Sequence, residues 1–207
     1  MTVKLIAITP DAEKTIAYVA RVSSPFQDNP DYAKLVRYLI DHQHWSPLEH
    51  ACMTLEISTS RMISAQILRH RSFTFSEFSQ RYAEPMDYVP VKARRQAEKN
   101  RQSSVDDLDD VTKHRWDNIQ KSMWVVAEAT YHEALAQGIA KEVARSILPM
   151  NTATRLYMTG SVRSWIHYIQ LRCQSDTQQE HREIAKKCKA VFVEQLPVVA
   201  EALAWKS

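Results

Sequence analysis

Apolar and polar residues repeat along the chain with a period of two in some stretches and of three to four in others. Residues 51–58 alternate between apolar and polar, which is typical of a strand with one buried face. Residues 1–8 form a short strand-like run, and residues 152–159 are rich in β-branched and aromatic side chains. These three stretches are therefore the predicted strands.

The helical period covers most of the remaining chain, and start and stop residues divide it into separate helices. Thr9, Ser60 and Ser161 are candidate N-terminal caps, and Ser175 or Asp176 is a candidate cap for the last long helix. The predicted helices span about residues 9–23, 29–40, 59–68, 116–138, 141–148, 161–172 and 175–197. In the longest, which Gly138 ends, the residues at helical spacing are Trp116, Ile119, Met123, Val126, Thr130 and Leu135.

The order of these elements predicts the fold class. Strands and helices are mixed along the chain without a regular strand–helix–strand repeat, which favours an α+β fold. We predict a mixed, mainly antiparallel sheet flanked by several helices, within a single domain of residues 1–207. Residues 92–110 are rich in charge and poor in apolar side chains, so they are the one candidate for a mobile segment.

Composition narrows the class of protein. Hydrophobic residues make up 44% of the chain and charged residues 25%, as in ordinary soluble globular proteins. The net charge of +3 is too small to argue for nucleic-acid binding by itself. No apolar run approaches the length of a membrane span, and residues 1–8 do not resemble a signal peptide. We therefore expect no membrane partner and a cytoplasmic location.

Glycine, cysteine and histidine placement excludes several kinds of site. Two glycines are too few for a Rossmann fingerprint or a P-loop, so side chains must hold the phosphates of any bound nucleotide. Cys52, Cys173 and Cys188 are isolated, which argues against disulfides or a zinc site and favours buried apolar roles. Three histidines in residues 42–50 are interpreted as solvated imidazoles in a turn, so we predict no bound metal.

Residues 69–82, called the basic segment below, consist mostly of cationic and hydroxyl-bearing side chains with phenylalanines between them. They include three arginines, one histidine, one glutamate and three serines. Arginine forks bind phosphate through two parallel hydrogen bonds, and neighbouring hydroxyls can donate to the same oxygens. The phenylalanines would hold the segment against a core, while Glu77 could accept a hydrogen bond from a ribose hydroxyl or orient an arginine. A solvated basic loop fits the composition equally well.

The order of residues in the basic segment favours a nucleotide site. Arg69-His70-Arg71, then seven residues, then Ser79 and Gln80-Arg81-Tyr82, resembles the signature of the flavin-dependent thymidylate synthases. Further stretches resemble other segments of that family, in the same order along the chain: residues 20–23, 44–50, 142–149 and 163–180. One such stretch could arise by chance, whereas several in the right order argue for membership of the family.

The resemblance implies an enzyme that forms dTMP from dUMP without an enzyme nucleophile. The carbon would come from methylenetetrahydrofolate and the hydride from reduced FAD, which NADPH reduces first. Members of the family assemble as homotetramers whose active sites lie between subunits. The expected partners are therefore dUMP, folate, NADPH and further copies of the chain, with no nucleic acid.

The resemblance also implies roles for residues of the matched stretches. Those expected at FAD are Ser46, Arg69, His70, Arg71, Glu77, Ser161, Arg163 and His167. Those expected at dUMP are Gln66, Arg69, Glu77, Ser79, Arg81, Arg145 and Arg172. Arg172 is the expected catalytic residue, because a fixed guanidinium would stabilise negative charge on the uracil ring. Many relatives carry asparagine where this chain has Ser161 and His167, so their contacts with FAD are expected to differ.

Two other functions fit parts of the sequence. Arginines between phenylalanines also suit a module that binds single-stranded nucleic acid through backbone charge and base stacking. A thymidylate synthase with a cysteine nucleophile would need an activated thiol, and Cys173 follows Arg172 directly. The low net charge argues against the first function, and the other family stretches do not fit the second.

Overall fold

Four strands form an antiparallel sheet at the centre of the chain. The computed structural model describes residues 1–85 and 87–205. The strands are β1 (Thr2–Ile8), β2 (Cys52–Ser60), β6 (Ala153–Ser161) and β3 (Thr74–Glu77), in the spatial order β1-β2-β6-β3. Each neighbouring pair is antiparallel. The predicted α+β class and the three predicted strands are confirmed, and the described sheet is antiparallel throughout rather than mixed.

β3 is a strand that the sequence analysis did not predict. It lies inside the basic segment and pairs with β6, from Thr74 opposite Thr159 to Glu77 opposite Leu156. With four residues it is too short for a period of two to be recognised. The pairing places the basic segment along one edge of the sheet.

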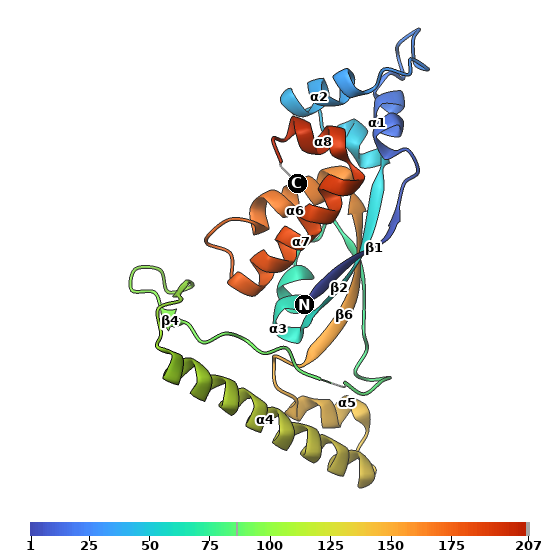
Figure 1. Ribbon diagram of the computed structural model, residues 1–207. Helices are drawn as coiled ribbons and strands as arrows, with labels where there is room; N and C mark the ends of the chain where they lie inside the picture. Colours follow the sequence, from blue (N-terminus) through green and yellow to red (C-terminus); the bar gives the residue numbers. More distant parts are fainter. Residues whose placement is uncertain (86, 206–207) are drawn as a thin grey trace.

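Helices cover one face of the sheet and gather beyond one of its ends (Figure 1). The covering helices are α3 (Arg61–Ile67), α6 (Val162–Arg172) and α7 (Gln179–Gln195). Those at the end are α1 (Ala12–Ala20), α2 (Ala33–Asp41), α8 (Pro197–Ala202) and the 3-10 helix η1 (Ser46–His50). Alternate residues of β2 and β6 point into the covered face, and Met53, Leu55, Ile57, Leu156 and Met158 are all buried there.

The longest helix and its neighbours form an arm that extends away from the sheet (Figure 1). The arm consists of β4 (Arg95–Gln96), β5 (Ser104–Val105), α4 (Asp110–Ala136), α5 (Lys141–Ala144) and the 3-10 turn η2 (Arg145–Ile147). Gly138 follows α4 with a φ of 82°, so it ends the helix as predicted. In the parts of the chain that the structure describes, no helix is both long enough and apolar enough to span a membrane.

An apolar stripe on α4 is not covered within the single chain. The helical spacing correctly predicts the helix, but the side chains that keep this spacing face solvent: Ile119 is 45%, Met123 58% and Val126 61% exposed. The buried residues of α4 are instead Gln120, Trp124 and Tyr131. Periodicity therefore identifies the helix, but the side that packs within the chain lies about a quarter of a turn away.

Residues 92–110 contain the small hairpin of β4 and β5. Opposite charges pair within and beside it, since Arg95 Nη2 lies 2.6 Å from Asp107 Oδ2 and Lys113 Nζ lies 2.8 Å from Asp106 Oδ1. These ion pairs are exposed and contribute little stability, so they show only that opposite charges meet within a stretch that has few apolar residues. The mobility of this segment stays a prediction.

Two of the predicted helix caps are confirmed and two are wrong. Ser60 accepts a hydrogen bond from the Ile63 amide at 3.4 Å, and Ser161 accepts one from the Ser164 amide at 3.2 Å. The Thr9 hydroxyl instead accepts from the Cys52 amide at 2.9 Å, because β1 and β2 bring these residues together. For α7, neither Ser175 nor Asp176 is the cap, because the helix begins only at Gln179, after Gln178 at the N-cap position.

Candidate functional site

The basic segment is anchored to the core by one phenylalanine. Phe73 is buried, and its ring lies edge-on to Trp165 with the centroids 4.9 Å apart. The ring also fills the space beside Gly160, where an added Cβ would come within 2.4 Å of it. The prediction that the phenylalanines hold the segment against a core is therefore confirmed at this position.

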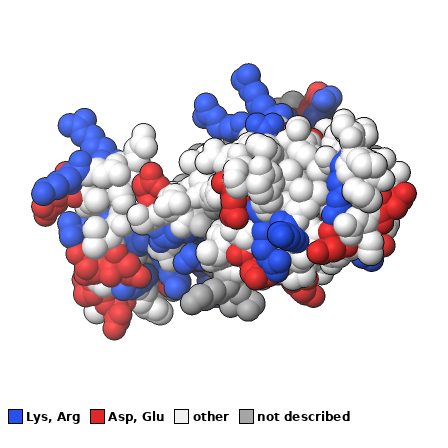
Figure 2. Space-filling model, turned by 90° about the horizontal axis from the view of Figure 1, so that it is seen from above, with Lys and Arg blue, Asp and Glu red and all other residues white. Residues whose placement is uncertain are grey.

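The burial of Phe73 also bears on the nucleic-acid alternative. Stacking on bases needs exposed aromatic rings, but Phe73 lies in the core and Phe75 packs against it. On the face shown in Figure 2, lysine and arginine side chains are interspersed with aspartate and glutamate. The burial of Phe73 and the partial burial of Phe75 argue against base stacking on these two rings, although Tyr82 at the end of the basic segment is exposed.

Arg172 and His70 meet at the C-terminal end of α6. Arg172 Nε donates a hydrogen bond to His70 Nε2 at 2.9 Å, and the His70 ring lies edge-on to Tyr168 with the centroids 4.9 Å apart. Burial, and then the charge of Arg172, lower the pKa of His70 to about 4. His70 is thus a neutral imidazole at pH 7, and it can hold the guanidinium in place as a hydrogen-bond acceptor.

A buried histidine, His181, lies beside this pair and was missed by the sequence analysis. Its Nε2 lies 3.2 Å from the Tyr168 hydroxyl, and its Nδ1 lies 3.2 Å from Gln66 Oε1. Burial, followed by the charges of Arg172 and His70, lowers the pKa of His181 to about 3. His181, Ile184 and Cys188 recur at helical spacing and share the buried face of α7. This spacing is the sequence signal from which the burial of His181 could have been predicted.

Glu77 of β3 is held by residues that the sequence analysis did not single out. Its Oε1 accepts hydrogen bonds from the Ser64 hydroxyl and, at 2.9 Å, from the Thr154 hydroxyl. Arg61 Nη1 lies 2.8 Å from the same oxygen. The Glu77 side chain is only 13% exposed, so this carboxylate has a fixed position beside α3.

A second group of predicted residues gathers at the N-terminus of α6. Arg163 Nη1 lies 2.7 Å from Glu49 Oε1, and the His167 ring lies edge-on to Trp45, the residue before Ser46, with the centroids 5.1 Å apart. A hydrogen bond from Ser161, together with Arg163, keeps the pKa of Glu49 below its ordinary value despite partial burial. Burial and the charge of Arg163 lower the pKa of His167, although Glu49 opposes them.

A third group lies where the basic segment meets α5. Arg81 Nη2 lies 3.1 Å from Glu142 Oε2, and Arg145 Nε donates to the Glu142 carbonyl at 3.4 Å. Ser79 lies two residues before Arg81 in the sequence and is exposed. Its carbonyl accepts hydrogen bonds from the amides of Tyr82 and Ala83 in a tight turn. Arg69 and Arg71 are exposed where α3 leads into the basic segment.

Most of the predicted residues fall into three bonded groups, while Glu77 is held apart from them by Arg61, Ser64 and Thr154. Among the described residues, no hydrogen bond or ion pair joins a member of one group to a member of another. The first group surrounds Arg172 and Gln66, the second surrounds Arg163, and the third surrounds Arg81. A groove of about 730 Å³ along α4 is lined by other residues, including Val111, Ile119 and Met123.

Among the described residues, cysteines and histidines do not gather into a metal site, and the predicted burial of the cysteines is confirmed for Cys188 but wrong for Cys52, which is exposed. Within residues 1–85 and 87–205, no cluster of three or more His, Cys, Asp or Glu side chains could hold a metal ion. Burial raises the pKa of the Cys173 thiol, with Lys189 opposing it, and burial also raises that of Cys188. Both thiols are therefore protonated at pH 7, which is unfavourable for a nucleophile.

Known proteins match this chain over almost its full length. The family described as thymidylate synthase complementing protein matches residues 4–198. A flavin-dependent thymidylate synthase from Synechocystis sp. is 56% identical over 193 residues, which are 93% of this chain and 90% of the relative. A probable flavin-dependent thymidylate synthase of Paramecium bursaria Chlorella virus 1 is 47% identical over 99% of this chain and 100% of the relative.

A solved structure matches the fold as well. The UMP/dUMP methylase PolB from Streptomyces cacaoi, bound with 5-Br dUMP, superposes with a TM-score of 0.85 at 28% identity, covering 99% of this chain and 95% of that one. This chain, with an antiparallel sheet in an α+β fold and similar to these enzymes in sequence and fold, is a methyltransferase by class. More narrowly, this chain belongs to the flavin-dependent thymidylate synthase family.

Proposed function

We propose that this protein converts dUMP to dTMP, with the carbon from methylenetetrahydrofolate and the hydride from FAD that NADPH has reduced. The observation that carries this proposal is the Arg172–His70 contact, in which a neutral imidazole holds a permanent positive charge at 2.9 Å. Family membership and the resemblance of the surrounding stretches support the substrates.

FAD fits the cationic and hydrogen-bonding groups that this chain offers. Arg69 and Arg71 are exposed and free to approach a pyrophosphate, with His70 between them. Around Arg163, Ser46 and His167 supply further polar groups, and Arg163 Nε is buried without a hydrogen-bond partner among the described residues. An unpaired buried donor is costly, so a bound acceptor there would be stabilising. When bound, FAD supplies the hydride that the reaction requires.

The dUMP phosphate suits the third group of residues. Arg81 pairs with the Glu142 carboxylate and Arg145 donates to the Glu142 carbonyl, and Ser79 offers a hydroxyl that can donate to a phosphate oxygen. The Arg81–Glu142 pair is exposed, so exchanging the carboxylate for a phosphate dianion costs little desolvation. Gln66, Arg69 and Glu77 would contact the rest of the nucleotide.

Arg172 would act on the uracil ring by charge alone. Hydride addition at C6 places negative charge on the ring and its carbonyl oxygen. A guanidinium stays protonated, so Arg172 stabilises that charge and does not remove a proton. His70 keeps the guanidinium oriented without adding a second positive charge that would repel it. This route needs no enzyme nucleophile.

A homotetramer would bring the three groups into one site. No hydrogen bond or ion pair joins the groups within the described residues, and the uncovered apolar stripe on α4 offers a surface for another copy. Closed symmetric assemblies are the common form of soluble oligomers. The site would then be shared between subunits.

The purified protein tests this proposal directly. Its visible absorption spectrum should show bound flavin, and a mixture with dUMP, methylenetetrahydrofolate and NADPH should yield dTMP. A protein that neither contains nor binds flavin in a fluorescence titration would remove the proposal.

A variant with Cys52, Cys173 and Cys188 all changed to alanine should still form dTMP. If that variant folds and binds dUMP but forms none, a thiol nucleophile is required.

A further inference from the structure

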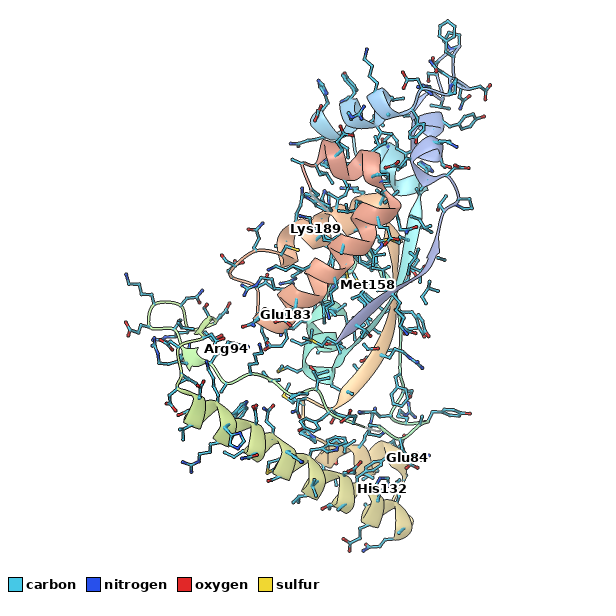
Figure 3. The ribbon with its side chains drawn as sticks, in the orientation of Figure 1. Glu84, Arg94, His132, Met158, Glu183 and Lys189 are labelled. Atoms are coloured by element: carbon cyan, nitrogen blue, oxygen red, sulfur yellow. The ribbon has the colours of Figure 1, made fainter. Side chains whose placement is uncertain are left out.

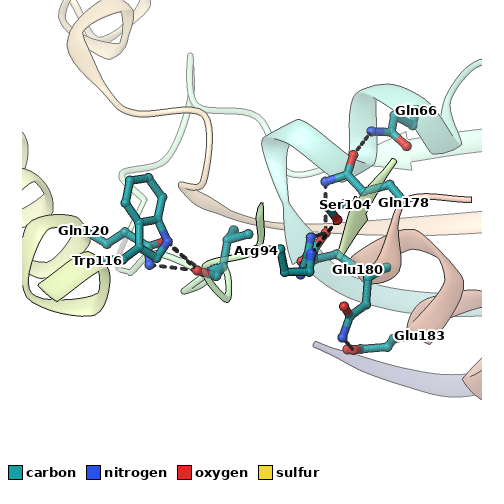
Figure 4. Close-up of polar contacts among 10 residues, drawn as sticks. Gln66, Arg94, Ser104, Trp116, Gln120, Gln178, Glu180 and Glu183 are labelled. Carbon is teal, nitrogen blue, oxygen red and sulfur yellow. Dashed lines mark hydrogen bonds and ion pairs between the residues drawn. The ribbon is translucent and has the colours of Figure 1, made fainter. Parts of the chain in front are cut away.

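A row of hydrogen-bonded side chains connects the arm to the first group of site residues (Figure 4). Arg94 Nη1 lies 2.7 Å from Glu180 Oε1, and Arg94 Nη2 donates to Glu180 Oε2 at 3.0 Å. Gln178 Nε2 donates to Glu180 Oε2 at 2.9 Å. Gln66 Nε2 then donates to Gln178 Oε1 at 2.7 Å, and Gln66 Oε1 lies 3.2 Å from His181 Nδ1.

The charged end of this row is unusually well enclosed. The Arg94 side chain is 9% exposed and that of Glu180 is 7%, whereas the neighbouring Arg95–Asp107 pair is more than 40% exposed on both sides. Arg94 Nε also donates to the Ser104 hydroxyl at 2.9 Å. Figure 3 shows Arg94 on the stretch between the arm and the sheet, near the end of α7 that carries Glu183.

The stretch that carries Arg94 is itself fixed to α4. Gln120 bonds the backbone of Val91 twice, with its Oε1 accepting from the amide and its Nε2 donating to the carbonyl, both at 2.9 Å. Trp116 Nε1 donates to the same carbonyl at 2.7 Å. Arg94 therefore reaches Glu180 from a backbone that α4 holds in place.

The anion at one end determines the direction of every bond in the row. Burial raises the pKa of Glu180, but hydrogen bonds from Arg94, from its own amide and from Gln178 outweigh it, so the carboxylate is ionised and can only accept. Gln178 must then turn its NH₂ toward Glu180 and its oxygen toward Gln66.

The same reasoning continues through Gln66 to the buried histidine. Since Gln178 presents an oxygen, Gln66 must turn its NH₂ toward it and its own oxygen toward His181. His181 must then carry its proton on Nδ1, which leaves Nε2 to accept from the Tyr168 hydroxyl at 3.2 Å. No member of the row can turn over without opposing two donors or two acceptors.

We propose that the Arg94–Glu180 pair locks the carboxamide of Gln66 in one orientation and thereby makes the site select uracil over cytosine. The inference rests on the proposed function, in which Gln66 and Arg172 both contact dUMP. These two side chains flank the same pair of imidazoles, since His70 accepts from Arg172 and its ring centroid lies 6.2 Å from that of His181. Arg94 and Glu180 are positioning residues, because they act through Gln66.

The chemical basis is the opposite hydrogen-bonding pattern of the two bases. Uracil donates from N3 and accepts at O4, whereas cytosine accepts at N3 and donates from its 4-amino group. A carboxamide that can turn over fits either base. In our proposal the locked carboxamide of Gln66 fits uracil, and cytosine in the same place would leave polar groups without hydrogen-bond partners.

Neutron diffraction from crystals of the wild-type protein tests the lock independently of any activity. We expect deuterium on Gln66 Nε2 pointing at Gln178 and deuterium on Nδ1 of His181. A Gln66 amide in the reverse orientation, or a His181 that carries its proton only on Nε2, would overturn the inference.

Calorimetric titration of dUMP and dCMP tests the consequence for selectivity. The double variant Arg94→Met with Glu180→Gln removes both charges together, so no lone buried charge is left. Its preference for dUMP over dCMP should fall on the order of tenfold, since Gln66 can then turn over. The control Arg95→Met with Asp107→Asn removes the exposed ion pair of the same hairpin and should keep the preference, as should Arg94→Lys.

Several results would contradict this assignment. A merely structural role predicts that both nucleotides weaken alike, so an unchanged preference in the folded double variant would overturn it. If the double variant does not fold, Gln178→Met interrupts the row while the ion pair stays intact, and it should lower the preference equally.

Formation of dTMP alongside a reversed Gln66 amide would refute only this inference. A wild-type protein that binds no dUMP would refute the proposed function, and the selectivity with it.

Discussion

At the scale of single residues, the most informative contact joins two groups that could both be positive. Arg172 and His70 can lie 2.9 Å apart because burial and the guanidinium itself lower the pKa of His70 to about 4. Charge repulsion is thereby replaced by a hydrogen bond in which the imidazole accepts. The contact fixes a permanent cation whose only available role is electrostatic.

The first prediction follows from that contact. Arg172→Ala should leave flavin binding intact but slow dTMP formation by on the order of a hundredfold or more, since a preorganised charge-stabilising donor is lost. Single-turnover formation of dTMP with pre-reduced flavin measures this step. As a matched control, Arg37→Ala removes an arginine that pairs with Glu201 between α2 and α8, and it should keep the wild-type rate. Near-normal turnover in Arg172→Ala would show that the ring is activated elsewhere.

A second residue-scale prediction concerns pH. In the unfolded chain a histidine of ordinary pKa 6.5 binds a proton below that pH, whereas folded His181 does so only near pH 3. The unfolded state therefore binds more protons between these values, and the free energy of unfolding falls as the pH drops from 6.5 toward 3. The slope contributed by one such histidine approaches about 1.4 kcal/mol per pH unit.

Chemical denaturation at several pH values between 7 and 4 measures this slope. His181→Gln can keep hydrogen bonds to its neighbours but has no proton to gain, so its free energy of unfolding should depend less steeply on pH than that of the wild type. Equal slopes for the two proteins would mean that another group causes the dependence.

At the scale of elements, the basic segment and β6 are matched in shape. Phe73 occupies the space beside Gly160, while β3 extends the segment along the edge of β6. Ser164 Oγ also donates to the Ser72 carbonyl at 3.3 Å, which ties the segment to the start of α6. The position of the proposed flavin and nucleotide residues thus depends on one ring packing against one glycine.

Gly160→Ala tests this dependence. The new methyl group would lie 2.4 Å from the Phe73 ring, so the ring and the segment must move. We expect a loss of about 1–3 kcal/mol in the free energy of unfolding, together with weaker flavin and dUMP binding. Thermal denaturation and fluorescence titration measure the two effects.

Gly138→Ala is the matched control. Its φ of 82° strains any side chain, but nothing lies within 4 Å of the added Cβ. It should cost about 1 kcal/mol of stability through the backbone alone and leave ligand binding unchanged. If Gly160→Ala also binds both ligands normally, the packing of Phe73 does not position the site.

At the scale of the whole molecule, α4 presents apolar side chains that the single chain does not cover. A solvent-exposed stripe with Met123 at 58% and Val126 at 61% exposure is unfavourable unless another surface packs on it. The three groups of site residues are not bonded to one another within the described residues, which agrees with a site that a second copy completes.

Charge introduced on this stripe should break the assembly. Met123→Glu places a carboxylate where a partner would bury a thioether, so light scattering should show a smaller species and dTMP formation should fall with it. Lys121→Glu changes α4 by two charge units on the side away from the stripe, and it should keep the wild-type mass and activity. An active wild-type monomer would contradict the shared site altogether.

Much of the fold could be predicted from local patterns. Alternation identified β2, helical spacing identified α4, and Ser60 and Ser161 identified the starts of α3 and α6, because each signal depends on residues a few positions apart. The shortage of glycine together with the Arg69-His70-Arg71 cluster pointed to phosphates held by side chains. The order of the matched stretches identified the family.

The remaining features depend on residues far apart in sequence that only folding brings together. The Cys52 amide decided that Thr9 does not cap α1. His70 is neutral because folding buries it and, secondly, because Arg172, 102 residues away, lies beside it. The partners of Glu77 and the burial of His181 likewise depend on the register of β3 against β6 and on the packing of α7. A local sequence pattern indicates whether a residue favours a helix or a strand, because secondary-structure propensity depends on neighbouring residues. Which groups share a hydrogen bond is decided by the geometry of the folded chain.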